Sequence, residues 1–374
     1  MFGAREAAWP LIRTDLGLSY FQIGLLLTLP SVLGALLQPL LGILGDSGHR
    51  RRIVLIGGGS FALALAATSV AWGFHPLLVA SLVLACSAGA FVSLSQASLM
   101  DLSPSAHERN MAQWAAAGSL GVLVGPLALA GSGAMGVGWR GLLLGLALLS
   151  VPFVVAARRL PLSHQGAAPR FGFVFKGAVR ALGRGEVVRW LVLLKLTDLL
   201  NDVFYGFLAL YFVDVVHVGP TRAGLAVAVW SGAGLVGDWL LIPLLARIDG
   251  LRLLRSTAAA MLFAYPAFLL VSGPGPKLAF LALIGLLRAG WYAIPKGRLF
   301  IELRGASGTA VALSDLSSLL GRLAPAIIGF AAERVGLDTA LWALVIAPAA
   351  LLIGLPWPAV AKGASRPSAP TPRD

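Results

Sequence analysis

Charge and cysteine are both scarce in this sequence of 374 residues. Charged residues make up 12% of the chain, about half the share in an average soluble protein, whereas 58% of the residues are hydrophobic. The single cysteine, Cys86, lies in an apolar run, which excludes an intrachain disulfide and a cysteine metal site. The sequence also has no Walker A motif, so direct coupling to ATP is not expected.

Long apolar runs take up most of the chain. A helix that crosses a bilayer needs about 20 apolar residues. Eleven runs of roughly this length lie near residues 20–45, 53–73, 76–99, 112–133, 138–157, 188–212, 222–247, 256–272, 278–297, 309–331 and 338–357. The sequence therefore predicts an all-α polytopic membrane protein.

The chain starts with a shorter apolar segment, residues 1–12, followed by a polar turn from Arg13 to Ser19. The segment lacks the three regions of a signal peptide. We interpret it as the second half of a first helix, and whether Met1 is the true start is left open.

The formal net charge is +13, which would also suit a nucleic-acid-binding protein. The basic residues, however, gather in alternate short loops and tails, twenty on one side of the membrane against five on the other. The positive-inside rule places the richer set in the cytoplasm and residue 13 outside. We therefore expect a multi-pass protein of the cell (plasma or inner) membrane, monomeric in the lipid bilayer, and no nucleic-acid partner.

The second half of the chain repeats polar landmarks of the first. Gln38 falls opposite Asp238, and Gly89 falls opposite Gly290, at nearly constant offset. Two parallel repeats of about six helices would place a binding site at their interface. The expected domains are a helical bundle at 1–157, a basic cytoplasmic loop at 158–187, a second bundle at 188–357 and a disordered cytoplasmic tail at 358–374.

The loop after the second span carries a recognisable pattern. It reads Gly42-Ile-Leu-Gly-Asp46-Ser-Gly-His-Arg50-Arg51-Arg52. This resembles the cytoplasmic loop signature of the major facilitator superfamily, G-x-L-a-D-r-x-G-r-r, with Ser47 in place of a basic residue and Gly48 one position early. The resemblance implies two pseudo-symmetric six-helix bundles that alternate access to a central site. It also implies a gating role for the loop residues Gly42, Asp46, Arg50, Arg51 and Arg52, and for Asp249 in a degraded second copy.

The fifth span has small residues at helical spacing. Gly118, Gly121 and Gly125 would let neighbouring helices approach closely, and Pro126 would kink the span. The pattern is similar to the antiporter signature of the same superfamily, although the later glycine pair is replaced at Leu129 and Ala130. The resemblance favours export, and generic close packing is the alternative.

The seventh span carries the most informative polar stripe. Lys195, Asp198 and Asp202 fall within roughly 60° of one another on a helix, and Asn201 and Tyr205 extend the stripe. Charges at membrane depth are costly and are candidates for function. The alternative is a structural ion pair between Lys195 and Asp198, which leaves Asp202 without a partner.

Other charges fall in the spans of the second half. Three cations stand against four carboxylates, so one acid lacks a fixed partner and would tend to take a proton. These residues are Lys195, Arg288 and Arg322, and Asp198, Asp202, Asp238 and Asp315. By the family resemblance, Arg288, Trp291 and Tyr292 of the tenth span would face the stripe on the seventh. Asp238, Asp315 and Arg322 are expected to be structural or gating charges.

The predicted function is secondary active transport of a small molecule, not enzymatic catalysis. Proton-coupled efflux by an antiporter is the leading form, driven by the proton gradient without a cofactor or metal. The alternatives are a proton-linked importer of a sugar or organic anion, and a non-transporting membrane protein derived from a carrier.

Overall fold

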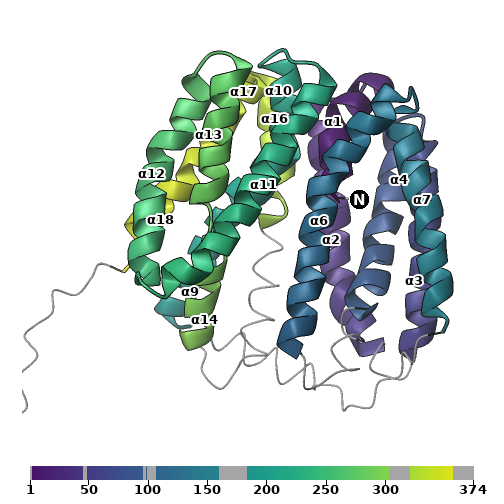
Figure 1. Ribbon diagram of the computed structural model, residues 1–374, viewed down its shortest axis with the longest axis horizontal. Helices are drawn as coiled ribbons and strands as arrows, with labels where there is room; N and C mark the ends of the chain where they lie inside the picture. The colour runs from purple at the N-terminus through teal and green to yellow at the C-terminus, as the bar shows by residue number, and fades with distance from the viewer. Residues whose placement is uncertain are drawn as a thin grey trace, which may run out of the picture.

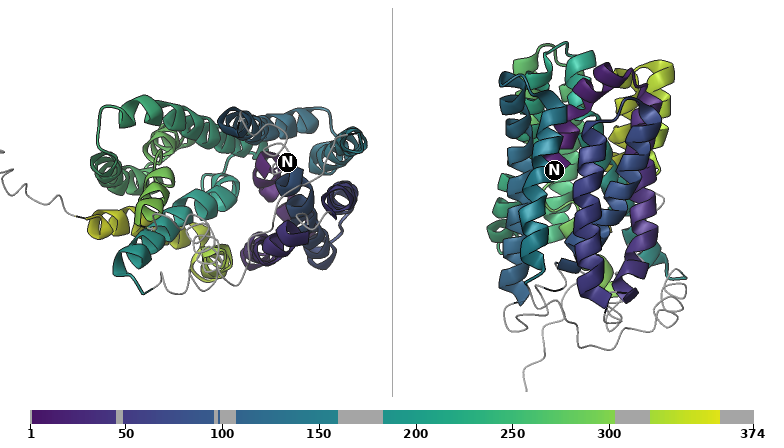
Figure 2. Two further views of the ribbon diagram at one scale, coloured as in Figure 1. Left: turned by 90° about the horizontal axis from the view of Figure 1, so that it is seen from below. Right: turned by 90° about the vertical axis from the view of Figure 1, so that its right-hand side faces the viewer.

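The computed structural model describes residues 2–44, 49–95, 98, 107–159, 183–302 and 321–356. Within these ranges all regular structure is helical, and the helices form two bundles side by side (Figure 1), which adjoin each other in the end-on view of Figure 2. The predicted tail lies outside the described residues, as does most of the predicted central loop.

The first bundle contains the purple to blue helices of Figure 1. They are α1 (Phe2–Leu16), α2 (Tyr20–Leu44), α3 (Arg50–Ser69), α4 (Phe74–Ala88) with the π-helix η2 (Gly89–Ser93), α6 (His107–Ala134) and α7 (Gly138–Ala157). Helix α1 continues through most of the stretch predicted to be a polar turn and ends at Leu16.

The second bundle is formed by the teal to yellow helices. They are α9 (Gly185–Asp198), the π-helix η4 (Leu199–Val203), α10 (Phe204–Asp214), α11 (Pro220–Leu245), α12 (Gly250–Leu270), α13 (Pro274–Leu287), α14 (Ala293–Glu302), α16 (Ala324–Val335), α17 (Leu337–Leu341), η5 (Trp342–Val345) and α18 (Ile346–Gly354).

The outer faces of both bundles suit a lipid environment. Seven helical segments of the described chain are long and apolar enough to cross a membrane, and two further apolar helices are shorter. Large apolar side chains point outward on them; Leu63, Phe263 and Ile353 are 73%, 77% and 86% exposed. In water such exposure would be unfavourable, whereas in a bilayer these side chains meet lipid.

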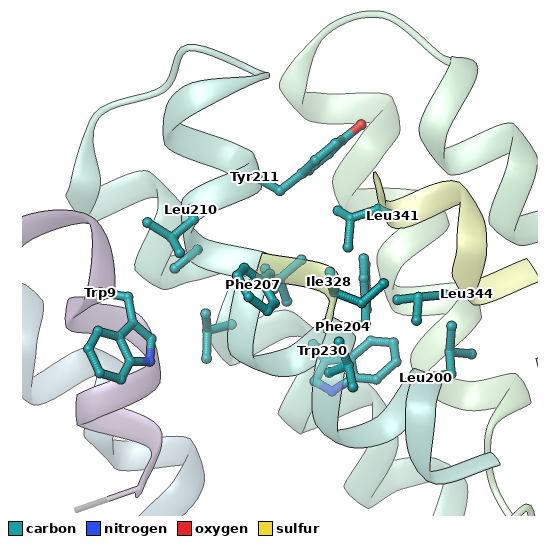
Figure 3. Close-up of a cluster of buried hydrophobic side chains, with 14 of the residues drawn as sticks. Trp9, Leu200, Phe204, Phe207, Leu210, Tyr211, Trp230, Ile328, Leu341 and Leu344 are labelled. Atoms are coloured by element: carbon teal, nitrogen blue, oxygen red, sulfur yellow. The ribbon is translucent and has the colours of Figure 1, made fainter. Parts of the chain in front are cut away.

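A buried aromatic cluster organises the second bundle (Figure 3). Phe204 packs edge-on against Trp230, Tyr265 and Phe268, with ring centroids 5.2, 5.4 and 5.5 Å away. Nearby, the ammonium group of Lys277 is buried and donates to the carbonyl oxygens of Phe268 and Leu269 at the end of α12 and to the hydroxyl of Tyr211. A cation there satisfies the last carbonyls of the helix and complements its dipole.

Besides the twelfth span, which contains the short 3-10 helix η5, three spans of the described chain are interrupted along their length. The fourth and seventh contain η2 and η4, and the tenth breaks between α13 and α14 around Gly290, whose φ is +81°. Gly89 begins η2, so the two glycines that the repeat places opposite each other both lie at interruptions. Irregular backbone at membrane depth is tolerated where it is buried in protein or lines a cavity, and π-turns are frequent at functional sites.

Candidate functional site

A cavity of about 880 Å³ lies between the two bundles. Its walls come from α1, α2, the α9–η4–α10 span, α11, the break at Gly290 and residues 321–325. Eight acidic or basic side chains of the described residues line it: Arg5, Glu6, Lys195, Asp198, Asp202, Asp238, Arg288 and Arg322.

The whole polar stripe of the seventh span faces this cavity. Lys195, Asp198, Asn201, Asp202 and Tyr205 all line it, because helical spacing puts them on one side and η4 widens the turn that carries Asn201 and Asp202. Lys195 and Asp198 form an ion pair of 2.8 Å within the helix. The structure therefore contains the local pair that the sequence left as an alternative, and Asp202 lies outside it.

Asp202 and Asp238 are cavity carboxylates without a direct partner. Both are exposed to the cavity, and neither has a hydrogen bond or an ion pair within 4.0 Å in the described part of the chain. The charges that act on Asp202 from a greater distance are Asp198, Arg322, Lys195 and Arg288. Its carboxylate is thus surrounded by charge but free to accept a ligand or a proton.

Arg288 reaches the cavity from the break in the tenth span. Its Nη1 donates to Oδ1 of Asn201 at 3.2 Å, and its guanidinium carbon lies 5.0 Å from the ring centre of Trp230. The guanidinium passes directly over Gly234 of α11, where any Cβ would collide with it. Both of these partners, the Asn201 amide and the Trp230 ring, are neutral. Among the described residues, no carboxylate lies at hydrogen-bonding distance from the Arg288 guanidinium.

Arg322 connects the two bundles at the cavity wall. Its Nη1 donates to the carbonyl oxygen of Ser31 on α2 at 3.1 Å, and the adjacent α16 donates from the Ala326 amide to Oγ1 of Thr28 at 3.1 Å. We expected Arg322 and Asp238 to be structural or gating charges. The structure places both on the cavity wall, and Asp315 lies outside the described residues.

Helix α1 adds two charges that the sequence reasoning did not include in the constellation. Arg5 and Glu6 form an ion pair of 2.7 Å, and Glu6 also accepts from Nε1 of Trp9 at 2.8 Å. Glu6 is only 4% exposed, so its charge depends on these partners. The available signal was a charged pair inside an apolar segment.

Trp291 is placed differently from the expectation. It is fully buried, does not line the cavity, and donates its indole N–H to Oγ1 of Thr257 on α12 at 3.1 Å. Its neighbour Tyr292 lines the cavity instead, with its hydroxyl against Lys296. The expectation rested on the family resemblance, which places the tenth helix at the cavity but does not fix the direction of each side chain. Here the helix breaks at Gly290, and Trp291 points to α12.

The outer end of the cavity is closed by contacts between the bundles. Asp214 at the end of α10 accepts from Nη1 of Arg13 at 2.5 Å and from the hydroxyl of Tyr20 at 2.9 Å. The amide of Tyr20 also donates to Glu333 of α16 at 3.0 Å. These contacts tie α1 and α2 to the second bundle on the side that the arginine distribution places outside.

The described residues of the loop and packing motifs do not line the cavity. Gly42 is near the end of α2, Arg50 is buried at the start of α3, Arg52 is exposed and Arg51 donates to the carbonyl oxygen of Arg158 at 2.6 Å. Asp249 caps α12 by accepting from the amides of Leu251 and Arg252. Asp46 lies outside the described residues.

The glycines of the fifth span differ in their surroundings. Gly125 packs against the backbone of α1 at Gly3 and Ala4, whereas no atom of the described residues would lie within 4 Å of a Cβ at Gly118 or Gly121. The carbonyl of the adjacent Pro126 faces Gly224 of α11, so the end of this motif lies at the interface between the bundles.

No cluster of three or more histidine, cysteine or acidic side chains suitable for a metal ion occurs in the described ranges. The cavity chemistry is therefore that of carboxylates, guanidiniums, an ammonium group, amide and hydroxyl groups.

Comparison with known proteins gives one family and several solved structures with a similar fold. The family model described as Major Facilitator Superfamily matches residues 6–295. A bacterial homolog of the human lysosomal transporter Spinster, in an inward-facing and occupied conformation, superposes with a TM-score of 0.73 at 16% identity, over 94% of this chain and 92% of that chain. The nucleoside transporter NupG superposes with a TM-score of 0.73 at 13% identity, over 94% and 93%. By sequence, no curated protein gives a significant match.

Proposed function

The chain belongs to the major facilitator superfamily, and we propose that it exports its substrate in exchange for protons, with Asp202 as the proton-carrying group. Membership and fold make it an integral multi-pass membrane protein and a secondary transporter of small molecules, not an enzyme. The proposal concerns the coupling, the direction and the residues.

The observation that supports Asp202 as the proton-carrying group is the difference between the two aspartates of the seventh span. Asp198 is neutralised by Lys195 at 2.8 Å, whereas Asp202, four residues on, faces the cavity without a direct partner. An unpaired carboxylate at membrane depth is unfavourable, and a proton or a cationic ligand relieves it. Asp202 can therefore hold a proton in one stage of the cycle and a substrate group in another.

Competition for one carboxylate produces exchange. When the cavity faces outside, a proton binds Asp202; when it faces the cytoplasm, the proton leaves and the substrate takes its place. With an inward proton gradient this sequence moves substrate outward. The motif that is similar to the antiporter signature favours the same direction, and its Pro126 lies against α11 of the other bundle.

Solute-driven proton movement in proteoliposomes tests this proposal. The vesicles contain a mixture of amino acids, sugars, nucleosides and carboxylic acids with a pH-sensitive dye, and are diluted into solute-free buffer of the same pH. Exchange acidifies the interior as solute leaves, whereas proton-linked import in reverse makes it more alkaline. The sign of the signal therefore separates the antiporter from the importer.

The variant Asp202→Asn is expected to reduce the acidification to the rate of protein-free vesicles. Glu186→Gln is the matched control, because Glu186 is an acid of the same span whose side chain is 58% exposed at the helix start. Acidification by Asp202→Asn at the wild-type rate would refute Asp202 as the proton carrier.

A further inference from the structure

The charges that line the cavity limit the kind of molecule that it accepts. We infer that the substrate is a small zwitterion, whose cationic group binds Asp202 and whose anionic group binds the guanidiniums of Arg288 and Arg322. This inference rests on the proposed use of the cavity for transport, and it follows from which cavity charges are already neutralised.

Half of the charged groups satisfy one another. Arg5 is paired with Glu6 at 2.7 Å, and Lys195 is paired with Asp198 at 2.8 Å. Each pair consists of near neighbours on one helix, so neither needs a ligand or the opposite bundle to remain neutral. These four side chains polarise the cavity but offer no uncompensated charge.

The other four charged side chains have no oppositely charged partner within 4.0 Å among the described residues. Arg288 and Arg322 donate to the amide oxygen of Asn201 and the carbonyl oxygen of Ser31, and the Nε of each has no hydrogen-bond partner in the described chain. Asp202 and Asp238 have no partner within 4.0 Å among the same residues. The described walls thus present two guanidiniums and two carboxylates for a ligand.

These opposite charges influence one another across a gap. Arg288 interacts electrostatically with both Asp238 and Asp202, and Asp202 also interacts with Arg322, although none of these forms an ion pair. Stacking on Trp230 and the passage over Gly234 hold Arg288 in place. A ligand with charges of both signs fills the gap and gives each side a partner.

A ligand of one sign satisfies only half of this site. An anion would neutralise the guanidiniums but leave Asp202 unpaired, and a cation would do the reverse. Unpaired charges away from bulk water are costly, so a molecule that pairs with both sides gains most from binding.

The described apolar part of the wall contains few aromatic rings. Among the described lining residues the aliphatic side chains are Leu27, Val203, Leu241, Ala293 and Pro325, and the rings are Tyr205 and Tyr292. The indoles of Trp9, Trp230 and Trp291 are buried behind the wall, with 2% exposure or less. A large organic cation would find few ring faces to stack on.

Matched ligands test the inference on the purified protein in detergent. The probes are the common L-amino acids and the dipeptide leucyl-leucine, each compared with its C-terminal amide, which keeps only the cation, and its N-acetyl form, which keeps only the anion. Sugars and nucleosides complete the panel. Binding is measured as a rise in the midpoint of thermal unfolding and then by titration calorimetry.

We expect at least one zwitterion to bind, and both of its single-charge derivatives to bind roughly tenfold or more weakly, because each loses a charge-assisted hydrogen bond. Equal or tighter binding of a derivative would overturn the inference. So would a panel in which no zwitterion binds, whether or not a sugar or nucleoside does.

Variants of the cavity residues show which side chain binds the anionic group of the ligand and which binds its cationic group. Arg322→Gln should weaken binding of the zwitterion about tenfold and leave binding of its amide unchanged, whereas Asp202→Asn should spare the N-acetyl form. Arg288→Gln is the second cation variant if Arg322→Gln does not fold. Exposed Arg252→Gln and Glu186→Gln are the charge-matched controls.

The result separates the substrate class from the coupling. Equilibrium binding in detergent needs no gradient, so a zwitterion that binds selectively but at a pH-independent affinity would leave the inference intact and remove the proton exchange. Proton exchange driven by an uncharged solute would do the opposite.

Discussion

Arg13 and Asp214 join the two bundles at the end of the molecule that the arginine distribution places outside, with Nη1 of the arginine 2.5 Å from the aspartate oxygen. Arg13 belongs to α1 and Asp214 ends α10, so the contact must break whenever the cavity opens to the outside. Tyr20 strengthens it, since its ring lies 4.1 Å from the guanidinium carbon and its hydroxyl donates to the same carboxylate. The closed outer end is therefore held in part by one ion pair.

Asp214→Asn should shift the conformational equilibrium toward the outward-open state. Partly exposed ion pairs contribute about 1 kcal/mol, which corresponds to roughly a fivefold change in population. The reporter is Ser31→Cys at the cavity wall in a Cys86→Ser background, labelled from outside by a membrane-impermeant maleimide. Labelling should become several times faster.

Asp15→Asn is the control for this shift. Asp15 pairs with Arg140 at 3.0 Å, also at the outer end, but both residues belong to the first bundle. Removing that pair should leave the labelling rate unchanged. Equal effects of the two variants would contradict a gating role for Asp214.

Gly234→Ala should weaken substrate binding without unfolding the protein. The new methyl group would occupy the position of the Arg288 guanidinium, which is the end of a flexible side chain and can move aside. The guanidinium would then leave Asn201 and Trp230, at an expected loss of about tenfold in affinity. Titration of the transported solute measures this loss, and the unfolding midpoint checks the fold.

Gly232→Ala on the same helix is its matched control. A Cβ there would lie 3.6 Å from Leu123, which is ordinary van der Waals contact. Equal affinities for the two variants would show that the position of Arg288 does not matter for binding.

Gly125→Ala and Gly121→Ala should change the stability of the protein in different ways, because only Gly125 packs closely against another helix. A Cβ at Gly125 would collide with the backbone of α1 at Gly3 and Ala4, whereas no atom of the described residues would lie within 4 Å of a Cβ at Gly121. We expect Gly125→Ala to destabilise the protein by about 1–3 kcal/mol, and Gly121→Ala to be neutral or stabilising by up to about 1 kcal/mol. Thermal unfolding of both variants in one detergent decides this, and equal midpoints would refute the α1–α6 contact.

The fold and one wall of the cavity could be predicted from the sequence because both depend on local periodicity. Apolar runs of membrane length define the helices, and the seventh-span residues share one face despite the π-turn at η4. A spacing rule holds as long as the helix continues, which is why Lys195 and Tyr205 line the same cavity.

The rest of the cavity depends on breaks and on contacts between distant segments. The turn at Gly290 redirects Trp291 toward α12, and no spacing rule extends across such a break. The place of Arg322 is set by the Ser31 carbonyl, 291 positions away in the sequence. Arg5 and Glu6 were not counted among the cavity charges, because the first segment was interpreted as only the second half of a helix.

The most direct test of the central claim is the pH dependence of substrate binding to purified wild type and Asp202→Asn. If a proton and the substrate compete for Asp202, the dissociation constant of the wild type should rise as the pH falls, approaching about tenfold per pH unit, while that of Asp202→Asn stays flat. Asp198→Asn should keep the slope, because Asp198 is already paired with Lys195. The same slope in Asp202→Asn as in wild type would show that the competing proton binds elsewhere and would contradict the account.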